Sequence, residues 1–394
     1  MIHELRIRYP RQSTTLYDFS AGSAMLDGRK PLHFFEPIVM SHLFDSVQFR
    51  DVVLRNRIGV PAMCQYSAQE GMANDWHFVH YGTRAIGGAG LIISEATAVA
   101  PEGRISPYDI GLWDERQIEP LARIVHFAKE QGCPMAVQLA HAGRKASMRR
   151  GWEAQTPLLE GKGGWQPIGP SPISFSSEHA TPLALDATGV RMVVNQFAVA
   201  ARRALACGFS AIEIHAAHGY LLHQFLSPLA NQRTDDYGGD FANRTRLLFE
   251  VVQAIRSVWP ERLPLFVRLS ATDWVPGGWG PEETVELCRG LKTQGVDLIN
   301  VSTAGMVPDA KIPVGPGFQT KFAEEVRREA GVPTAAVGLI TSPAQADHIV
   351  RTGQADVVLL GREILRNPYW PLMAAHELGH VIVWPPQYER SAPR

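Results

Sequence analysis

Cys207-Gly208-Phe-Ser-Ala211-Ile-Glu-Ile214-His215-Ala-Ala-His218-Gly-Tyr220 joins three structural signals in one short stretch. Gly208 follows an amphipathic segment, and glycine readily takes the left-handed conformation that ends a helix. Residues 211–214 then form a short apolar run, as a buried strand does. The chain leaves this run with two histidines and a tyrosine, and parallel α/β proteins keep their chemistry at such strand ends. The stretch therefore predicts one unit of a strand–helix repeat with a site at its end.

The same order of glycine and apolar strand recurs along the chain, after Gly132, Gly295, Gly331 and Gly353. Together with three further apolar runs, the predicted strands are residues 57–60, 91–94, 135–138, 211–214, 265–269, 297–301, 334–337 and 356–360. Intervening segments such as 118–128 and 248–255 carry apolar residues at helical spacing. Pro281 and Pro343 are typical of a first helical turn. Eight such units predict an α/β fold, a (β/α)₈ TIM barrel, with a doubly wound open sheet as the alternative.

Two segments do not fit the repeat. Residues 148–186 follow the third strand, are rich in Gly, Pro and Ser, and are expected to form a long loop or lid over the barrel mouth. Residues 1–40 contain several arginines and no apolar periodicity. This N-terminal extension is a disordered arm, a targeting peptide, or the product of an upstream start codon, and we favour true initiation at Met40. The expected domain is then residues 41–394.

The amino-acid composition limits which binding partners and which cellular compartment we expect for the protein. The 394 residues carry a formal net charge of -1, which gives no reason to expect a nucleic acid or an anionic membrane as partner. No apolar run approaches the roughly 20 residues of a membrane span. Four widely spaced cysteines without a CxxC pair argue against a zinc ribbon or an iron–sulfur cluster. A reduced, cytoplasmic protein fits best.

Polar side chains and glycines gather where the predicted strands end, at Cys64, Tyr66, Glu95, Gln138, His141, His215, His218, Tyr220, Arg268, Ser302, Gly338, Gly361 and Arg362. Glycines after the seventh and eighth strands suit a phosphate held by backbone N–H groups. Arg268 lies within a strand, where burial is costly without an anionic partner. The edge of a reduced flavin mononucleotide (FMN) would supply that negative charge. Two imidazoles can donate to one carbonyl oxygen, and a nearby phenol can give up a proton.

The chain resembles the Old Yellow Enzyme family of FMN-dependent ene-reductases over residues 41–390. The matching segments are residues 63–66, 138–145, 213–220, 225–239, 243–244, 267–270 and 360–363. Cys64 and the ending 387–390 are similar to the thermophilic-like subgroup of that family. Ala62 departs from the proline often found before the Met-Cys pair.

The resemblance implies a role for each candidate residue. His215 and His218 would bind the carbonyl oxygen of an enone or enal, and Tyr220 would protonate its α-carbon as the general acid. Gln138 and Arg268 would hold the flavin ring, Cys64 would tune it, and Gly338, Gly361 and Arg362 would bind its phosphate, with Lys145 a weaker candidate for the ring. Tyr66 would line the substrate pocket. Arg390 would reach the neighbouring subunit's site in a homodimer or homotetramer, and NADPH or NADH would donate hydride.

Other classes of function remain open at this point. His376-Glu-Leu-Gly-His380 matches the HExxH signature of zinc metallopeptidases. That site needs both histidines on one helix and a third ligand further on, and no histidine follows His380. We therefore expect no metal. A lyase or aldolase on the same barrel would need a Schiff-base lysine or a metal cluster at the strand ends. A barrel that binds flavin without catalysis is the last alternative.

Overall fold

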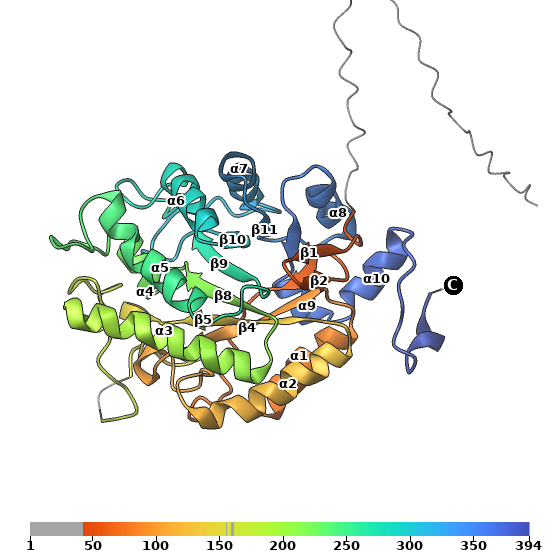
Figure 1. Ribbon diagram of the computed structural model, residues 1–394, viewed down its shortest axis with the longest axis horizontal. Helices are drawn as coiled ribbons and strands as arrows, with labels where there is room; N and C mark the ends of the chain where they lie inside the picture. Colours follow the sequence, from red (N-terminus) through yellow and green to blue (C-terminus); the bar gives the residue numbers. More distant parts are fainter. Residues whose placement is uncertain (1–41, 155, 159–160, 394) are drawn as a thin grey trace, which may run out of the picture. The chain divides into compact units, whose positions relative to one another are not determined.

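The eight predicted strands form one closed, parallel barrel in the computed structural model, which describes residues 42–154, 156–158 and 161–393 (Figure 1). Neighbours in the barrel follow chain order, and Val358 of the last strand pairs with Ile58 of the first. The barrel strands are β3 (Ile58–Val60), β4 (Leu91–Ala98), β5 (Met135–Ala140), β8 (Ala211–Ala216), β9 (Leu265–Ser270), β10 (Leu298–Ser302), β11 (Thr334–Val337) and β12 (Val357–Leu359). The predicted TIM barrel is confirmed, and the open sheet is wrong.

Helices surround the barrel, as Figure 1 shows. They are α1 (Asp75–Ile86), α2 (Ile118–Glu130), α3 (Ala187–Cys207), α4 (Leu221–Leu226), α5 (Phe241–Arg256), α6 (Pro281–Thr293), α7 (Thr320–Ala330), α8 (Pro343–Arg351), α9 (Arg362–Arg366) and α10 (Trp370–Glu377). Leu121, Ile124 and Val125 on α2 are buried, so the predicted apolar stripe faces the strands. Pro281 and Pro343 begin α6 and α8, as expected from the sequence.

A short hairpin closes the amino-terminal end of the barrel. Strands β1 (Val47–Phe49) and β2 (Val52–Leu54) pair antiparallel. Phe49 and Leu54 are buried among residues that begin barrel strands, such as Leu91 and Leu298. The ring of Phe49 packs edge-on against Phe266 at 5.5 Å between centroids. With this end filled by apolar side chains, polar chemistry is confined to the carboxyl ends of the strands.

The glycines that suggested the repeat have the backbone conformation expected of them. Gly208 ends α3 with φ of 85°, and Gly331 ends α7 with φ of 64°. At positive φ a side chain would clash with the backbone, so only glycine ends the helix there without strain. The chain can then turn directly into the next strand, which keeps the units short.

The insertion after β5 is irregular, as predicted for residues 148–186. It contains one small parallel ladder, β6 (Ile168–Gly169) with β7 (Leu183–Ala184). Trp165 ties it to the barrel top by donating an indole N–H to the carbonyl oxygen of Glu102 at 2.8 Å. The prediction for residues 1–40 lies outside the described residues. Among the described residues, no helix is both long and apolar enough to cross a membrane.

Candidate active site

The segment after β8 makes a sharp turn that brings its polar side chains over the barrel mouth. His215 lies within β8, whereas His218 and Gly219 have positive φ values of 57° and 72°. A Cβ at Gly219 would lie 2.0 Å from the carbonyl oxygen of Gly305, so a side chain cannot fit there. The tight turn places Tyr220 at the start of α4, beside the two histidines.

His215 and His218 present ring nitrogens to each other. Nε2 of His215 lies 3.4 Å from Nδ1 of His218, with the rings nearly perpendicular at 87°. Nδ1 of His215 accepts a hydrogen bond from the backbone N–H of Ala217 at 3.3 Å. Nε2 of His218 lies 2.7 Å from Oγ of Ser302. The two facing nitrogens are close enough for both to contact a single oxygen atom of a ligand.

Both imidazoles are held in the neutral form. Burial lowers the pKa of His215 and of His218 well below the ordinary value, and the positive charge of Arg268 lowers both further. A neutral imidazole carries one N–H and one acceptor nitrogen. At neutral pH the pair can therefore act as hydrogen-bond donors but carries no charge of its own.

Tyr220 lies against the histidines with its hydroxyl protonated. Its ring packs edge-on to His215 at 4.9 Å between centroids. Burial raises the pKa of Tyr220 above its ordinary value, and negative charge at Cys64 or Asp109 would raise it further. A phenol in this environment keeps its proton at neutral pH, as a general acid must.

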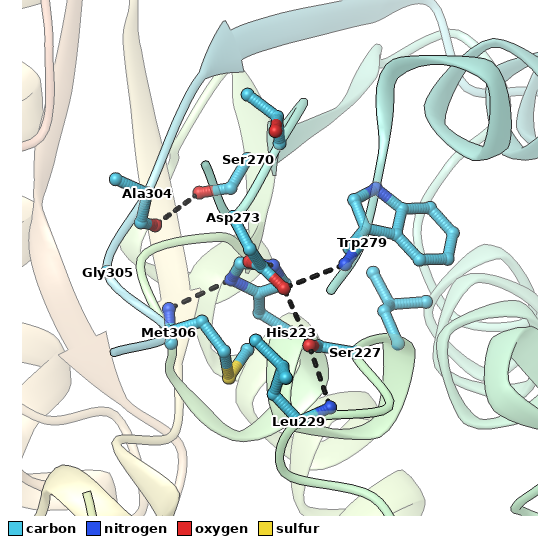
Figure 2. Close-up of polar contacts among 12 residues, drawn as sticks. His223, Ser227, Leu229, Ser270, Asp273, Trp279, Ala304, Gly305 and Met306 are labelled. Atoms are coloured by element: carbon cyan, nitrogen blue, oxygen red, sulfur yellow. Dashed lines mark hydrogen bonds and ion pairs between the residues drawn. The ribbon is translucent and has the colours of Figure 1, made fainter. Parts of the chain in front are cut away.

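A buried network fixes the turn that carries these residues (Figure 2). The backbone N–H of Gly219 donates to Nδ1 of His223 at 2.9 Å, and Nε2 of His223 lies 3.1 Å from Asp273 Oδ1. The other carboxylate oxygen accepts from Ser227 Oγ at 2.6 Å and from the Trp279 backbone at 2.8 Å. Burial opposes ionisation of Asp273, but the nearby imidazole and these donors outweigh it and lower the pKa of the carboxyl. The carboxylate thus orients the imidazole that holds the turn.

Lys145 ties the turn to a second loop. Its ammonium donates to the carbonyl oxygens of His218 at 2.9 Å and Gly305 at 3.1 Å. It also lies 5.1 Å from the ring centroid of Tyr220. Burial, with Arg144 nearby, lowers the pKa of Lys145 to about 8. Because its amine already serves two backbone carbonyls, Lys145 connects loops, and the weaker prediction that it holds the flavin ring has no support in these contacts.

Arg268 lies within the electrostatic influence of a buried carboxyl group in the barrel. Glu213 is completely buried and is the charge that most favours the ionised form of Arg268. Its two carboxylate oxygens accept from Gln138 Nε2 at 2.7 Å and from Asn300 Nδ2 at 2.9 Å. Burial raises the pKa of Glu213, however, so a flavin as the counter-charge of Arg268 stays a prediction. Moreover, Nε of Arg268 is buried and has no hydrogen-bond partner among the described residues.

Cys64 and Tyr66 lie on the loop after β3, which a second buried pair holds. Glu95 accepts the backbone N–H of Gln65 at 2.9 Å, and its other oxygen lies 3.2 Å from His77 Nε2. Burial, followed by the negative charges nearby, raises the pKa of Cys64 well above its ordinary value, so the thiol stays protonated. Both Cys64 and Tyr66 pack against the apolar cluster that also contacts Tyr220. The predicted residues at the ends of β3, β5, β8 and β9 thus come together at one mouth of the barrel.

A cavity of about 390 Å³ extends from this mouth to the ends of β11 and β12. Its lining includes Ala62, Arg268, Gly338, Gly361 and Arg362. A Cβ at Gly361 would meet no atom within 4 Å, so the backbone there borders open space. The unpaired Nε of Arg268 at one end, with glycines and an arginine at the other, fits a flavin ring and a phosphate respectively.

Two predicted features lie away from the cavity. Helix α10 ends at Glu377, so His380 lies beyond it and cannot share a helix face with His376 as a metallopeptidase requires. Among the described residues, no three His, Cys, Asp or Glu side chains are grouped to hold a metal ion. Arg390 is exposed in a C-terminal segment whose Tyr388 packs on Tyr369 at 5.8 Å.

Three residues of the site were missed or given no role from the sequence. Glu213 could have been found, because a carboxylate inside an apolar strand needs a buried partner. Ser302 was noted at a strand end without a role. Asp273 gave no signal, since its position under the turn after β8 depends on how β8 and β9 lie together in space.

Known proteins resemble the chain over nearly all of its described length. The model of the NADH:flavin oxidoreductase / NADH oxidase family matches residues 42–380. An NADPH dehydrogenase of Geobacillus thermodenitrificans (strain NG80-2) is 48% identical over 350 residues, which cover 88% of this chain and 98% of the relative. Among solved structures, morphinone reductase superposes with a TM-score of 0.74 at 27% identity, covering 88% of this chain and 92% of that one.

A further structure of morphinone reductase, in complex with tetrahydroNAD, has a TM-score of 0.72 at 26% identity, with 88% of this chain and 93% of that chain covered. The predicted resemblance to Old Yellow Enzymes is confirmed by these matches. The barrel, the cavity and the sequence similarity agree, and the chain belongs to the FMN-dependent NADH:flavin oxidoreductase / NADH oxidase family of oxidoreductases.

Proposed function

We propose that the enzyme reduces the C=C bond of α,β-unsaturated carbonyl compounds, with NADPH or NADH as the source of electrons. When bound, FMN supplies hydride transfer between the nicotinamide and the substrate. The observation that carries the proposal is the convergence of His215 Nε2 and His218 Nδ1, 3.4 Å apart, beside a protonated tyrosine.

The two histidines would bind the carbonyl oxygen of the substrate. Hydride arriving at the β-carbon moves negative charge onto that oxygen, and donors already in place stabilise the charge without reorganisation. Because both imidazoles are neutral, they stabilise the developing enolate by hydrogen bonding and do not protonate it outright. The proton would go instead from the Tyr220 hydroxyl to the α-carbon, which completes the reduction.

Residues that line the cavity, together with Gln138 and Cys64 outside its lining, would hold the cofactor. Arg268, with its free Nε, and the Gln138 amide suit the polar edge of the flavin ring. The protonated Cys64 thiol would lie near the ring as a weak donor. Gly338, Gly361 and Arg362 would bind the phosphate at the far end of the cavity.

Tyr66 and Arg390 complete the proposed site. Tyr66 lies on the loop that also carries Cys64 and would line the substrate pocket. Val381 and Val383, in the C-terminal segment, are exposed in the single chain. Apolar side chains exposed in this way favour burial against a second subunit. A homodimer or homotetramer would let Arg390 reach the neighbouring site.

An anaerobic spectral titration tests the function directly. The purified holoenzyme should lose its flavin absorbance on addition of NADPH or NADH and regain it when cyclohex-2-enone is added. Recovery with the enone, and none with cyclohexanone as the saturated control, supports the proposal. A protein that bleaches with nicotinamide but is reoxidised only by oxygen or quinones would overturn the enone assignment. It would leave the family assignment intact.

A further inference from the structure

The backbone of His218 has a conformation that its surroundings must hold in place. Its φ is 57°, in the left-handed region that a residue with a side chain adopts only when its contacts favour it. The direction in which Cβ leaves the backbone depends on that angle. The 3.4 Å approach of the His218 ring to Nε2 of His215 therefore depends on how the backbone of His218 is bound.

The backbone N–H of His218 is bound by Ser270, a residue with no role in the site so far. The N–H donates to Oγ of Ser270 at 2.9 Å. The Ser270 hydroxyl in turn donates to the carbonyl oxygen of Ala304 at 2.9 Å, as Figure 2 shows. Both directions are fixed by the partners, because a backbone N–H can only donate and a carbonyl oxygen can only accept. One hydroxyl thus serves as acceptor and donor at the same time.

Ser270 lies between the two loops that it joins. It is the last residue of β9, and β9 pairs with β8 on one side and with β10 on the other. His218 follows β8, and Ala304 follows β10. Ala304 also has a positive φ, of 65°. A single buried hydroxyl at a strand end therefore bridges two left-handed residues from neighbouring loops.

The same two loops touch directly beside this bridge. A Cβ at Gly305 would lie 2.4 Å from the carbonyl carbon of His218, and Lys145 binds the carbonyl oxygens of both residues. The lysine holds carbonyl groups, whereas Ser270 holds the N–H of His218. Without the Ser270 hydroxyl, this N–H and the carbonyl of Ala304 would each lose a partner. A backbone that turns to find another partner carries the ring of His218 with it.

We propose that Ser270 is a positioning residue, whose hydroxyl holds His218 in the left-handed conformation and so keeps its ring beside His215. The inference rests on the proposed function, because it names what places the second of the two donors to a carbonyl oxygen. Ser270 acts through the backbone of His218 and does not touch the substrate, since its hydroxyl already serves two backbone groups.

Reoxidation of the reduced holoenzyme tests this role. Anaerobic stopped-flow spectroscopy compares cyclohex-2-enone, which needs the two histidines, with ferricyanide, which takes electrons from the reduced flavin without a carbonyl oxygen to bind. In Ser270→Ala, the apparent dissociation constant for the enone should rise about tenfold, and the ferricyanide rate should stay within about twofold of the wild type. Ser270→Thr retains the hydroxyl and should recover most of the affinity. An unchanged enone constant, or equal slowing with both oxidants, would overturn the proposal.

Thr334→Val is the matched control. It removes a buried hydroxyl from another barrel strand, β11, and that hydroxyl has no hydrogen-bond partner among the described residues. Its rates with both oxidants should equal those of the wild type. A loss of enone affinity as large as in Ser270→Ala would show that any missing strand hydroxyl has this effect, against the proposal.

Hydrogen exchange, resolved to single amides by mass spectrometry, tests the contact without a substrate. The amide of His218 should be protected in the wild type and should exchange about tenfold faster in Ser270→Ala. A His218 amide that exchanges freely in the wild type overturns the proposal without any variant. A wild-type enzyme that ferricyanide reoxidises and cyclohex-2-enone does not, with His218 protected as expected, contradicts the proposed function instead.

Discussion

At the scale of single residues, the site depends on groups whose burial sets their protonation state. His215 and His218 are neutral because burial and Arg268 disfavour the imidazolium, and Tyr220 keeps its proton because burial disfavours the phenolate. A charged histidine would protonate the substrate oxygen, and a phenolate would have no proton to give. The same apolar surroundings therefore give the histidines and the tyrosine complementary roles.

Replacement of Tyr220 by phenylalanine should separate the two half-reactions. The ring would still pack on His215, so flavin reduction by NADPH is expected to stay within about twofold of the wild type. Reoxidation by cyclohex-2-enone should slow by about 100-fold, the usual contribution of a positioned general acid. Anaerobic stopped-flow spectroscopy measures both steps. Tyr66→Phe is the matched control, because it removes a phenol hydroxyl from a second tyrosine that packs against the same apolar cluster. Equal slowing of both steps in Tyr220→Phe would show a packing defect.

At the scale of elements, three strand ends are joined by one ammonium group. Lys145 follows β5, His218 follows β8, and Gly305 follows β10. The lysine donates to both backbone carbonyls, and at this point Gly219 and Gly305 come so close that neither has room for a side chain. The position of His218 thus depends on the ammonium group of Lys145, and burial lowers the pKa of that group.

This contact predicts a pH dependence. The pKa of Lys145 is lowered to about 8, so the ammonium is present below that pH and becomes an amine as the pH rises through it. Charge-assisted hydrogen bonds are about twice as strong as neutral ones, so affinity for cyclohex-2-enone should fall about threefold between pH 7 and pH 9. His215 and His218 are neutral throughout this range and do not contribute.

Two variants isolate the lysine. Lys145→Met should bind the enone more weakly and show no dependence on pH between 7 and 9. Lys145→Arg keeps its charge throughout this range and should also be flat, closer to the wild-type affinity at pH 7. Spectral titration of the oxidised enzyme measures each value. A fall of the same size in Lys145→Met would assign the pH dependence to another group.

The elements were predictable from the sequence to a greater extent than their contacts. Apolar runs and helix-ending glycines gave all eight barrel strands, because those signals are local. The residues at strand ends were also found, since their positions follow from the strands. The pairing of Glu213 with Gln138 was not, because it depends on β5 and β8 lying in register, with these two residues directly opposite. A hydrogen bond that depends on the register between two strands cannot be predicted from the sequence of either strand alone.

At the scale of the whole molecule, the barrel provides two ends with different chemistry. The hairpin of β1 and β2 fills the amino-terminal end with apolar side chains, and the mouth keeps the buried charged and polar groups. Three buried carboxyl groups near the mouth are each matched by a cation or an imidazole: Glu213 by Arg268, Glu95 by His77, and Asp273 by His223. Such pairing lowers the cost of burying charge and holds the loops in fixed positions.

The C-terminal segment should extend this arrangement across subunits. Val381 and Val383 expose their side chains, and Arg390 is also exposed, so we predict that these groups contact another copy of the chain. Deletion of residues 383–394 is expected to reduce the mass measured by light scattering and to raise the KM for cyclohex-2-enone about tenfold, the loss of one charged contact. Flavin content should not change, because the cavity lies within the barrel.

Arg390→Ala is the variant that separates assembly from catalysis. It keeps the apolar residues of the segment, so the mass should remain that of the wild type, whereas the KM should rise as in the deletion. If the deletion changes the mass and Arg390→Ala leaves the KM untouched, the segment serves assembly alone. If neither variant changes mass or KM, the shared site is wrong, and one barrel contains every residue that the reaction needs.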